Sequence, residues 1–524
     1  MLILKEALDA ATVQWDREQK EFQPAEKTKA DAFGTADQIQ SQTLYTSTGL
    51  VWKTIDPNGN ETQTDHDLAA RPVKTWQPDP TTGLVHSANS PVTETIYDAA
   101  SNVAATINPL GNRWDFTHDA RNRQIKEESP AVVDAETSGN PSTRPTSETF
   151  LDGAGNVIAT KDPRGAVTET VFDRANRPST ITTPAVPIYG VSGDIQLSST
   201  THYDMNSNVV KAVDYEGNAI VNYYDKLNRL SATATNPVSG QPSEIYGSPA
   251  ADDIVVHNTH DDAGNLVQVT DGEGAVTGFR YDGLSRNTQT IWDEGDDLER
   301  RKTLAYDALV LTSRTDEKAQ VTNYSYDDLH RLEDVVYVGR TIDNRHYTYD
   351  DNSNILTVTH PNEVNTLRDT ASTWDPLNRL TGETSADVTH SYVLDKAGNR
   401  LSTTYGQTSL QIVSTYDPLN RLAILTEGTR VTTYAYNLNG SIVEKVLPND
   451  VTVAGTFDLL GRKKSSVNTA DGAAQPFAQY DYGHDKQGNL VEIDESYPLG
   501  NLTARIVTNA YDKVYRLDTE TIAV

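Results

Sequence analysis

Ten aspartates in this sequence are each followed four residues later by an arginine, and the pattern reads aromatic-Asp-x-x-x-Arg. A carboxylate beside a guanidinium could bind an anion or assist proton transfer. The ten pairs are Asp67/Arg71, Asp119/Arg123, Asp173/Arg177, Asp225/Arg229, Asp282/Arg286, Asp327/Arg331, Asp375/Arg379, Asp417/Arg421, Asp458/Arg462 and Asp512/Arg516. An active site occurs once, whereas these pairs recur throughout the chain. We therefore interpret them as structural: Asp caps a turn, while Arg packs on a neighbouring tyrosine and pairs with a carboxylate of the next hairpin.

A second class of turn reads aromatic-Asp-x-x-Gly/Ser-Asn and alternates with the first. Its members are Asp98/Asn102, Asp152/Asn156, Asp204/Asn208, Asp261/Asn265, Asp350/Asn354, Asp395/Asn399 and Asp485/Asn489. Two degenerate members end differently: Tyr306-Asp307 in Leu311, and Tyr436-Asn437 in Ser441. A composite unit covers roughly 40–57 residues, which is a period typical of repeat proteins.

A third turn precedes the arginine class by eleven residues in the first part of the chain. It begins at Asp56, Asn108, Asp162, Asp214 and Asp271, and each ends in Gly at its fourth position. After about residue 330 it fades. We interpret this as a change of repeat subtype near residues 330–345, within one continuous array.

The turns and their flanks predict an all-β fold of tandem hairpins. Asp is favoured at the first position of a type I turn, and Gly at the fourth position supplies a positive φ, so that the hairpin closes through a G1 bulge. Aromatics recur at period two before the Asp, as in Tyr324 and Tyr326. That period places both rings on one face of a strand.

Composition excludes several classes of protein. The 524 residues carry 44 Lys and Arg against 74 Asp and Glu, a net charge of −30, which disfavours nucleic-acid partners and anionic lipid. There is no Cys, hence no disulfide and no thiolate metal site. No apolar run is long enough for membrane insertion, and no signal peptide is visible. Tyr outnumbers Phe by 25 to 8; Tyr suits half-buried strands because its hydroxyl can form a hydrogen bond.

Two other segments invite a metal-binding interpretation. Asp56, Asn58 and Asn60 resemble the start of an EF-hand loop, but Gly falls at position 4 and Asp67 at position 12, so a plain turn is favoured. The acidic run at 293–300 is interpreted as a solvated loop. No hydrolase, metalloprotease or phosphate-loop motif occurs in the sequence. We therefore predict no catalytic residues, no cofactor, no metal and no enzyme activity.

Three longer inserts, at residues 131–147, 184–200 and 237–256, are rich in Pro, Ser and Gly. They are interpreted as surface loops between hairpins, and they are better candidates for ligand contact than the repeats.

The repeats resemble the YD repeats of the Rhs type, whose pattern is roughly Tyr-Asp-x-x-Gly-Asn/Arg-Leu, and the resemblance covers about residues 45–516. In that family the hairpins wind into a spiral, hollow β-shell, found in bacterial Rhs polymorphic toxins, in the C-terminal components of Tc toxins and in teneurins. The resemblance implies structural rather than catalytic roles for Tyr97, Asp98, Asn102, Asp119, Arg123, Asp173, Arg177, Tyr203, Asp204, Asn208, Tyr224, Asp225, Arg229, Tyr281, Asp282, Arg286, Tyr326, Asp327, Arg331, Trp374, Asp375, Arg379, Tyr416, Asp417, Arg421, Tyr511, Asp512 and Arg516.

The expected organisation is an irregular or partly helical N-terminal segment, residues 1–44, followed by one repeat array, residues 45–524. Family toxins carry a self-cleaving core segment and a toxin domain after the repeats. Neither is recognised here, and we expect a shell, or a fragment of one, that lacks a C-terminal cap. The resemblance implies a secreted or cell-surface protein that encloses or scaffolds a toxin segment, with that polypeptide or a second shell subunit as partner. The alternative is an adhesion protein that contacts surface glycans.

Overall fold

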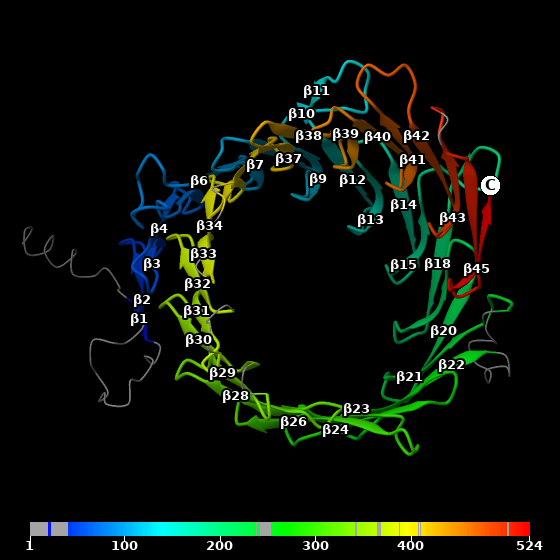
Figure 1. Ribbon diagram of the computed structural model, residues 1–524, viewed down its shortest axis with the longest axis horizontal. Helices are drawn as coiled ribbons and strands as arrows, with labels where there is room; N and C mark the ends of the chain where they lie inside the picture. Colours follow the sequence, from blue (N-terminus) through cyan, green and yellow to red (C-terminus); the bar gives the residue numbers. More distant parts are fainter. Residues whose placement is uncertain are drawn as a thin grey trace, which may run out of the picture. The chain divides into compact units, whose positions relative to one another are not determined.

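The fold is all-β throughout the residues that the computed structural model describes, and this confirms the fold class predicted above (Figure 1). These residues are 19–22, 40–236, 238–241, 253–340, 343–363, 368–386, 388–406, 408, 410–499 and 502–524. Over these ranges, no helix is long and apolar enough to cross a lipid bilayer.

The chain divides into two compact units, each built from two separate stretches. Unit 1 comprises Met1–Phe116 and Leu304–Thr429, and unit 2 comprises Thr117–Thr303 and Arg430–Val524. We call the first stretch of each unit its early segment and the second its late segment. The N-terminal segment contributes strands where it is described, at residues 19–22 and 40–44, and the remainder of residues 1–44 lies outside the described ranges.

The strands of unit 1 are five to seven residues long after the four-residue β1. They are β1 (Gln19–Phe22), β2 (Gln40–Tyr45), β3 (Val51–Ile55), β4 (Glu61–His66), β5 (Pro72–Trp76), β6 (Val92–Tyr97), β7 (Val103–Ile107), β27 (Val310–Thr315), β28 (Val321–Tyr326), β29 (Leu332–Tyr337), β30 (Arg345–Tyr349), β31 (Ile355–Thr359), β32 (Thr370–Trp374), β33 (Leu380–Ser385), β34 (Val388–Leu394), β35 (Arg400–Tyr405), β36 (Leu410–Tyr416) and β37 (Leu422–Glu427). Strands β8 (Arg113–His118) and β26 (Arg300–Asp307) contain the unit boundaries.

Unit 2 has strands of the same kind and two shorter ladders. They are β9 (Gln124–Glu128), β10 (Val132–Val133), β11 (Ser142–Thr143), β12 (Thr146–Leu151), β13 (Val157–Lys161), β14 (Val167–Phe172), β15 (Pro178–Thr182), β16 (Val186–Pro187), β17 (Asp194–Ile195), β18 (Ser198–Tyr203), β19 (Val209–Val213), β20 (Ala219–Tyr224), β21 (Leu230–Thr235), β22 (Ile254–His260), β23 (Leu266–Thr270), β24 (Val276–Tyr281), β25 (Asn287–Trp292), β38 (Arg430–Tyr436), β39 (Ile442–Val446), β40 (Thr452–Phe457), β41 (Lys463–Thr469), β42 (Ala478–His484), β43 (Leu490–Ser496), β44 (Arg505–Tyr511) and β45 (Leu517–Ala523).

Within each unit, consecutive strands of the main sheet pair antiparallel, as the hairpin prediction requires. The register shifts by one residue just before the turn, for example between Ile96 and Tyr97. The fourth turn residue has a positive φ whether it is Gly155 (99°) or Asn122 (62°). This is the bulged turn that the Asp-x-x-Gly pattern predicts, and Asn replaces Gly because its short side chain tolerates the left-handed region.

Antiparallel pairing sorts the turns onto two edges of the sheet. The aspartate–arginine and aspartate–asparagine turns connect every second strand and so share one edge, which we call the turn edge. The third turn class and the inserts connect the strands in between and lie on the opposite edge, which we call the loop edge. One edge is thus uniform and the other variable.

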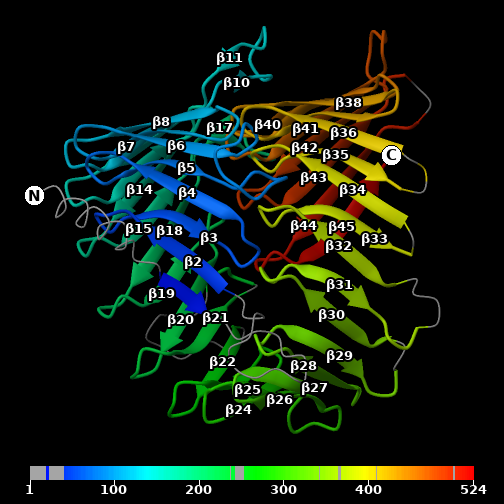
Figure 2. The same ribbon diagram turned by 90° about the vertical axis from the view of Figure 1, so that its left-hand side faces the viewer.

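In each unit the early and late segments meet through contacts between residues 270–308 positions apart. In unit 1, Asn58 donates its side-chain amide to Asp350 at 3.0 Å. In unit 2, Asn439 donates to Asp162 at 2.6 Å. In both cases the loop edge of the early segment meets the turn edge of the late segment. Figure 2 shows early strands β2–β5 and late strands β30–β34 of unit 1 meeting in this way. Each unit is thus formed by two distant stretches of the array whose facing edges are joined by polar contacts.

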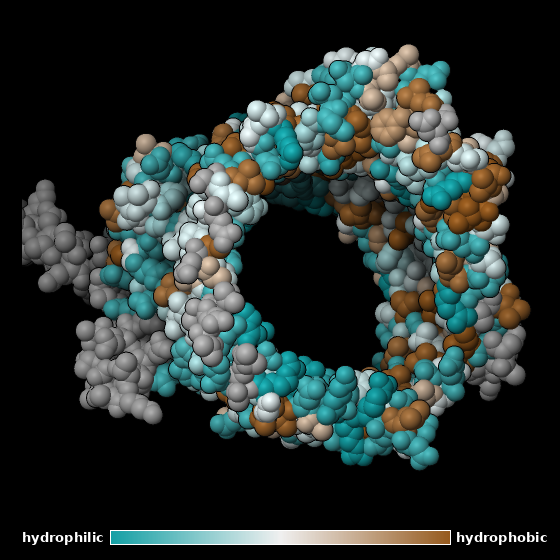
Figure 3. All heavy atoms as spheres, in the orientation of Figure 1, coloured by the Kyte–Doolittle hydropathy of each residue, from teal (hydrophilic) through white to brown (hydrophobic). Residues whose placement is uncertain are grey.

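Buried apolar side chains are mainly Val and Ala, because a single sheet layer leaves most side chains half exposed on one face. The exposed apolar residues are dispersed among polar ones on the visible face in Figure 3. A compact apolar cluster joins Val186, Ile188 and Leu197, with Ile195 and Tyr215 packed against it.

That cluster corrects the interpretation of two inserts as surface loops. The insert at 184–200 contains the buried residues of the cluster, and the insert at 131–147 buries Val132 (3% exposed). The latter also donates the backbone N–H of Ala135 to the carbonyl of Tyr436. These inserts are held in place by their buried apolar residues and by backbone hydrogen bonds to the late segment. Most of the third insert, 237–256, lies outside the described residues.

Candidate functional site

The aspartate–arginine turn fastens one hairpin to the next. In the turn at Asp173, one carboxylate oxygen accepts the backbone N–H of Arg177 at 3.0 Å and the other accepts its Nε at 2.8 Å. Nη1 of Arg177 donates to the carbonyl of Asp204, in the following turn, at 2.8 Å. The guanidinium carbon lies 4.5 Å from the ring centroid of Tyr203. One arginine therefore closes its own turn and holds the next.

The same forward contact recurs along the turn edge at distances of 2.7–3.4 Å. It joins Arg71 to Asp98, Arg123 to Asp152, Arg177 to Asp204, Arg229 to Asp261, Arg331 to Asp350, Arg379 to Asp395 and Arg462 to Asp485. The predicted stacking on a neighbouring tyrosine is present at Arg71, Arg177 and Arg331. The predicted pairing with the next hairpin's carboxylate is wrong: the carboxylate belongs to the arginine's own turn, and the next turn offers its carbonyl. Four residues is the spacing that folds the two side chains together within one turn.

In nine turns the Tyr or Trp that precedes the Asp makes the reverse contact. Its polar hydrogen is donated to the carbonyl of the residue that follows the preceding turn, at 2.7–3.1 Å. Such bonds link Tyr97 to Pro72, Tyr203 to Pro178, Tyr224 to Val209, Tyr281 to Leu266, Tyr326 to Leu311, Tyr349 to Leu332, Tyr416 to Arg400, Tyr511 to Leu490 and Trp374 to Ile355. Phe has no such hydrogen, which explains why Tyr dominates the aromatics.

The asparagine-class turns complete the series. The side chain of Asn156 donates to the carboxylate of Asp152 at 2.8 Å, and also to the side-chain oxygen of Asn176 in the next turn at 3.1 Å. Equivalent forward bonds run from Asn208 to Asn228, Asn354 to Asn378 and Asn399 to Asn420. Both classes of turn are therefore hydrogen-bonded to the next turn, one through an arginine and the other through an asparagine side chain.

These bonds favour the charged carboxylate. The hydrogen bond from Arg123, with the backbone N–H groups of the turn, lowers the pKa of Asp119 to about 2. The pKa of Asp67 and of Asp173 is lowered by the same arrangement. In the asparagine class, the side chain of Asn208 is the first cause of a lowered pKa of Asp204. Acids with lowered pKa values stay ionised at neutral pH and serve as hydrogen-bond acceptors rather than as proton donors.

The loop edge of the early segment carries contacts that the sequence analysis missed. Arg164 donates to the carbonyl of Asp458 at 2.6 Å and pairs with Glu136 at 2.8 Å. Arg462 donates to the carbonyl of Pro187 at 2.9 Å. The hydroxyl of Tyr515 donates to Asp214. Three turns of the third class, at Asp56, Asp162 and Asp214, therefore contact a turn of the late segment. The fading of this class after residue 330 was the one sequence signal of the pairing.

The two segments suspected of metal binding use their polar groups within the protein. Asp56 accepts the side-chain amides of Asn60, at 2.9 Å, and Asn352, at 2.7 Å. This supports the plain-turn interpretation. In the run at 293–300, Asp293 pairs with Arg300, and Glu299 with Arg301.

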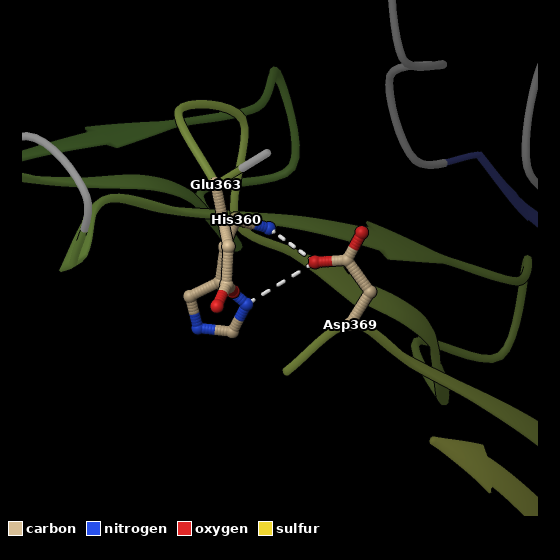
Figure 4. A group of neighbouring side chains, drawn as sticks. All are labelled: His360, Glu363 and Asp369. Atoms are coloured by element: carbon tan, nitrogen blue, oxygen red, sulfur yellow. Dashed lines mark hydrogen bonds and ion pairs between the residues drawn. The ribbon is translucent and has the colours of Figure 1, made fainter. Parts of the chain in front are cut away.

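A cluster outside the repeats combines an imidazole with two carboxylates. His360, Glu363 and Asp369 each direct one metal-ligand atom into a volume in which these atoms lie within 4.8 Å of one another (Figure 4). Within the described ranges it is the one group of this kind. Its spacing, His-x2-Glu-x5-Asp, matches no common metal motif, so the sequence analysis missed it. The available signal was a histidine and an aspartate flanking a single loop.

Comparison with known families supports the repeat assignment. The family described as Teneurin YD-shell matches residues 251–452. No curated protein sequence matches the chain.

Two solved structures share the fold at low sequence identity. One is described as the crystal structure of TcdB2-TccC3-Cdc42; it is 13% identical, covers 90% of this chain and aligns with a TM-score of 0.50. The other is the Photorhabdus luminescens Tc holotoxin pore with a TccC3-D651A mutation; it is 12% identical, covers 92% and aligns with a TM-score of 0.53. This chain spans 28% and 29% of those chains, so it corresponds to less than a third of either.

Proposed function

Taking the chain as a YD-shell repeat protein, with the family match at residues 251–452, we propose that it forms the non-catalytic wall of a secreted shell that encloses or scaffolds a polypeptide effector. The observation that carries the proposal is that each of these repeat side chains makes two structural contacts. In the seven forward contacts described above, the arginine is engaged by its own turn and by the next one. Groups so engaged build a wall and are poorly placed for turnover.

The similar structures add support for a partner. One of them contains TccC3 together with TcdB2, and the other is a Tc holotoxin pore that carries a TccC3 mutation. We extend this to the present chain as a wall-forming component whose partner is an enclosed polypeptide or a second shell subunit. The net charge of −30 suits a wall that does not adhere to nucleic acid.

The proposal is tested by protease protection. A marginally stable reporter domain is fused after Val524 of the full chain, and trypsin cleavage of the reporter is compared with that of the free reporter and of the reporter fused to an unrelated β-solenoid. We expect slower cleavage only in the fusion to this chain. Arg164→Ala with Arg462→Ala, which removes contacts between the segments of unit 2, is expected to restore cleavage.

Equal cleavage of the reporter in the fusion to this chain, in the β-solenoid fusion and in the free state would contradict enclosure. A glycan array provides the competing outcome: binding that is lost on altering loop-edge residues, together with an unprotected reporter, would establish the adhesion alternative instead.

A further inference from the structure

We propose that His360, Glu363 and Asp369 form a binding site for a divalent transition-metal ion, Zn²⁺ being the best match, that joins the turn at residues 360–363 to Asp369. The inference is independent of the shell function. It departs from the expectation, based on sequence motifs, of a chain without a metal site.

Strand register fixes two of the three ligands. Strands β31 and β32 pair with Val358 opposite Thr370, which places His360, just after one strand, beside Asp369, just before the other. The backbone N–H of His360 donates to Asp369 Oδ1 at 2.6 Å, and the imidazole Nδ1 lies 3.2 Å from the same oxygen. In a tetrahedral zinc site with bonds of about 2 Å, neighbouring ligand atoms lie about 3.3 Å apart. The pair is therefore already at ligand spacing.

A hydrogen-bonded turn supplies the third ligand. The backbone N–H of Glu363 donates to the carbonyl of His360 at 2.9 Å, and this turn brings the carboxylate of Glu363 over the imidazole (Figure 4). Arg368 Nε holds Glu363 Oε2 at 3.0 Å, and its Nη1 holds Asp343 at 3.0 Å. A partner in this position orients a ligating carboxylate and leaves its other oxygen for the metal.

Burial separates this group from an ordinary surface cluster. The side chains of His360, Glu363 and Asp369 are 7%, 14% and 26% exposed. One imidazole with two carboxylates suits zinc and its neighbours, whereas Ca²⁺ takes six to eight oxygens. Three protein ligands leave one position for water, and a metal bound there would join the ends of β31 and β32 to the turn between them.

The test is a titration of the untagged full chain with ZnCl2 against a competing zinc indicator, with Co²⁺ absorption as a second readout. Wild type is expected to bind one more Zn²⁺ tightly than His360→Gln. Asp369→Asn retains an acceptor for the backbone bond of His360, and we expect it to bind at least tenfold more weakly. Zn²⁺ should raise the thermal midpoint of wild type but not that of His360→Gln.

His346→Gln is the matched control. His346 also pairs with a carboxylate, Asp334, at 2.8 Å in the same unit, but it belongs to no group of three ligands in the described part of the chain. It should leave the zinc stoichiometry unchanged. Equal stoichiometry in wild type, His360→Gln and Asp369→Asn, with all three folded by circular dichroism, would overturn the proposal, as would an equal loss in His346→Gln.

Discussion

The turn edge and the loop edge of the sheet are built from similar turns, yet they differ in how each turn contacts the next turn along the same edge. At the turn edge, Arg177 spans two turns and Tyr203 reaches back to the preceding one. At the loop edge, the carboxylate of Asp271 accepts the backbone N–H groups of Glu273 and Ala275, both within its own turn. The difference teaches that a short turn motif is enough to form a hairpin, whereas a long polar side chain holds neighbouring hairpins in their order along the sheet.

The largest effect is expected where a turn-edge residue also meets the early segment. Arg462→Ala removes the partner of Asp458, whose side chain is only 2% exposed, and the bonds to Asp485 and Pro187. We expect the free energy of unfolding to fall by about 3 kcal/mol, because the buried carboxylate of Asp458 loses its cationic partner. Urea unfolding monitored by near-ultraviolet circular dichroism measures it.

Arg516→Ala is the control for that change. Arg516 makes the same ion pair with Asp512 at 2.7 Å, but its side chain is 67% exposed. Solvent screens such a pair, and we expect at most about 0.5 kcal/mol. Equal losses of unfolding free energy in the two variants would show that arginine contacts between turns add nothing to stability.

The tyrosine bond ranks second. Tyr326 is half-buried and donates its hydroxyl to the carbonyl of Leu311 at 3.0 Å. Tyr326→Ala should cost about 2 kcal/mol, below the figure for a fully buried ring. Tyr326→Phe should cost about 1 kcal/mol because only the hydrogen bond is lost. Hydrogen exchange of β27 and β28 would localise the change, and an unaltered Phe variant would refute the role of the hydroxyl.

A direct comparison of the edges uses the turn aspartates. Asp417→Ala removes the cap and the partner of Arg421, which lies at 2.6 Å, and should cost about 1 kcal/mol. Asp271→Ala removes a cap alone and should cost about 0.5 kcal/mol. Chemical denaturation of both variants ranks them. The reverse order would mean that the arginine contact is not stabilising.

The smallest effect of a single substitution is expected for Asp119, on the stability of the protein at acid pH. Because the pKa of Asp119 is about 2 in the folded protein and about 4 in an unfolded chain, its contribution to stability is complete above pH 4 and is lost as the pH falls towards 2. Asp119→Asn should reduce the slope of thermal midpoint against pH between 4 and 2. A variant with the wild-type slope would show that this carboxylate does not contribute to acid sensitivity.

The hairpins and their turns could be predicted from sequence because Asp, Gly and paired aromatics act over four or five residues. The hydrogen-bond partners of Arg123 could not be predicted from sequence. The carboxylate of its own turn and that of the next turn both fit the four-residue spacing, and only the three-dimensional position of Asp152 shows which groups Arg123 contacts. The inserts were misjudged because Val186 and Leu197 are buried by residues distant in the chain, such as Tyr215. The cluster at His360 depends on strand register, which no local pattern encodes.

The tyrosine and arginine hydrogen bonds also indicate the order in which the hairpins form contacts during synthesis. A carbonyl such as that of Pro178 belongs to the hairpin already synthesised, and the tyrosine that binds it, Tyr203, arrives with the next one. Arg177 then finds its acceptor in the same arriving hairpin. Each newly translated hairpin thus completes the contacts of the preceding one, so the array can assemble from the N-terminus during synthesis. The loop edge of the early segment is then already formed when the turns of the late segment pack against it.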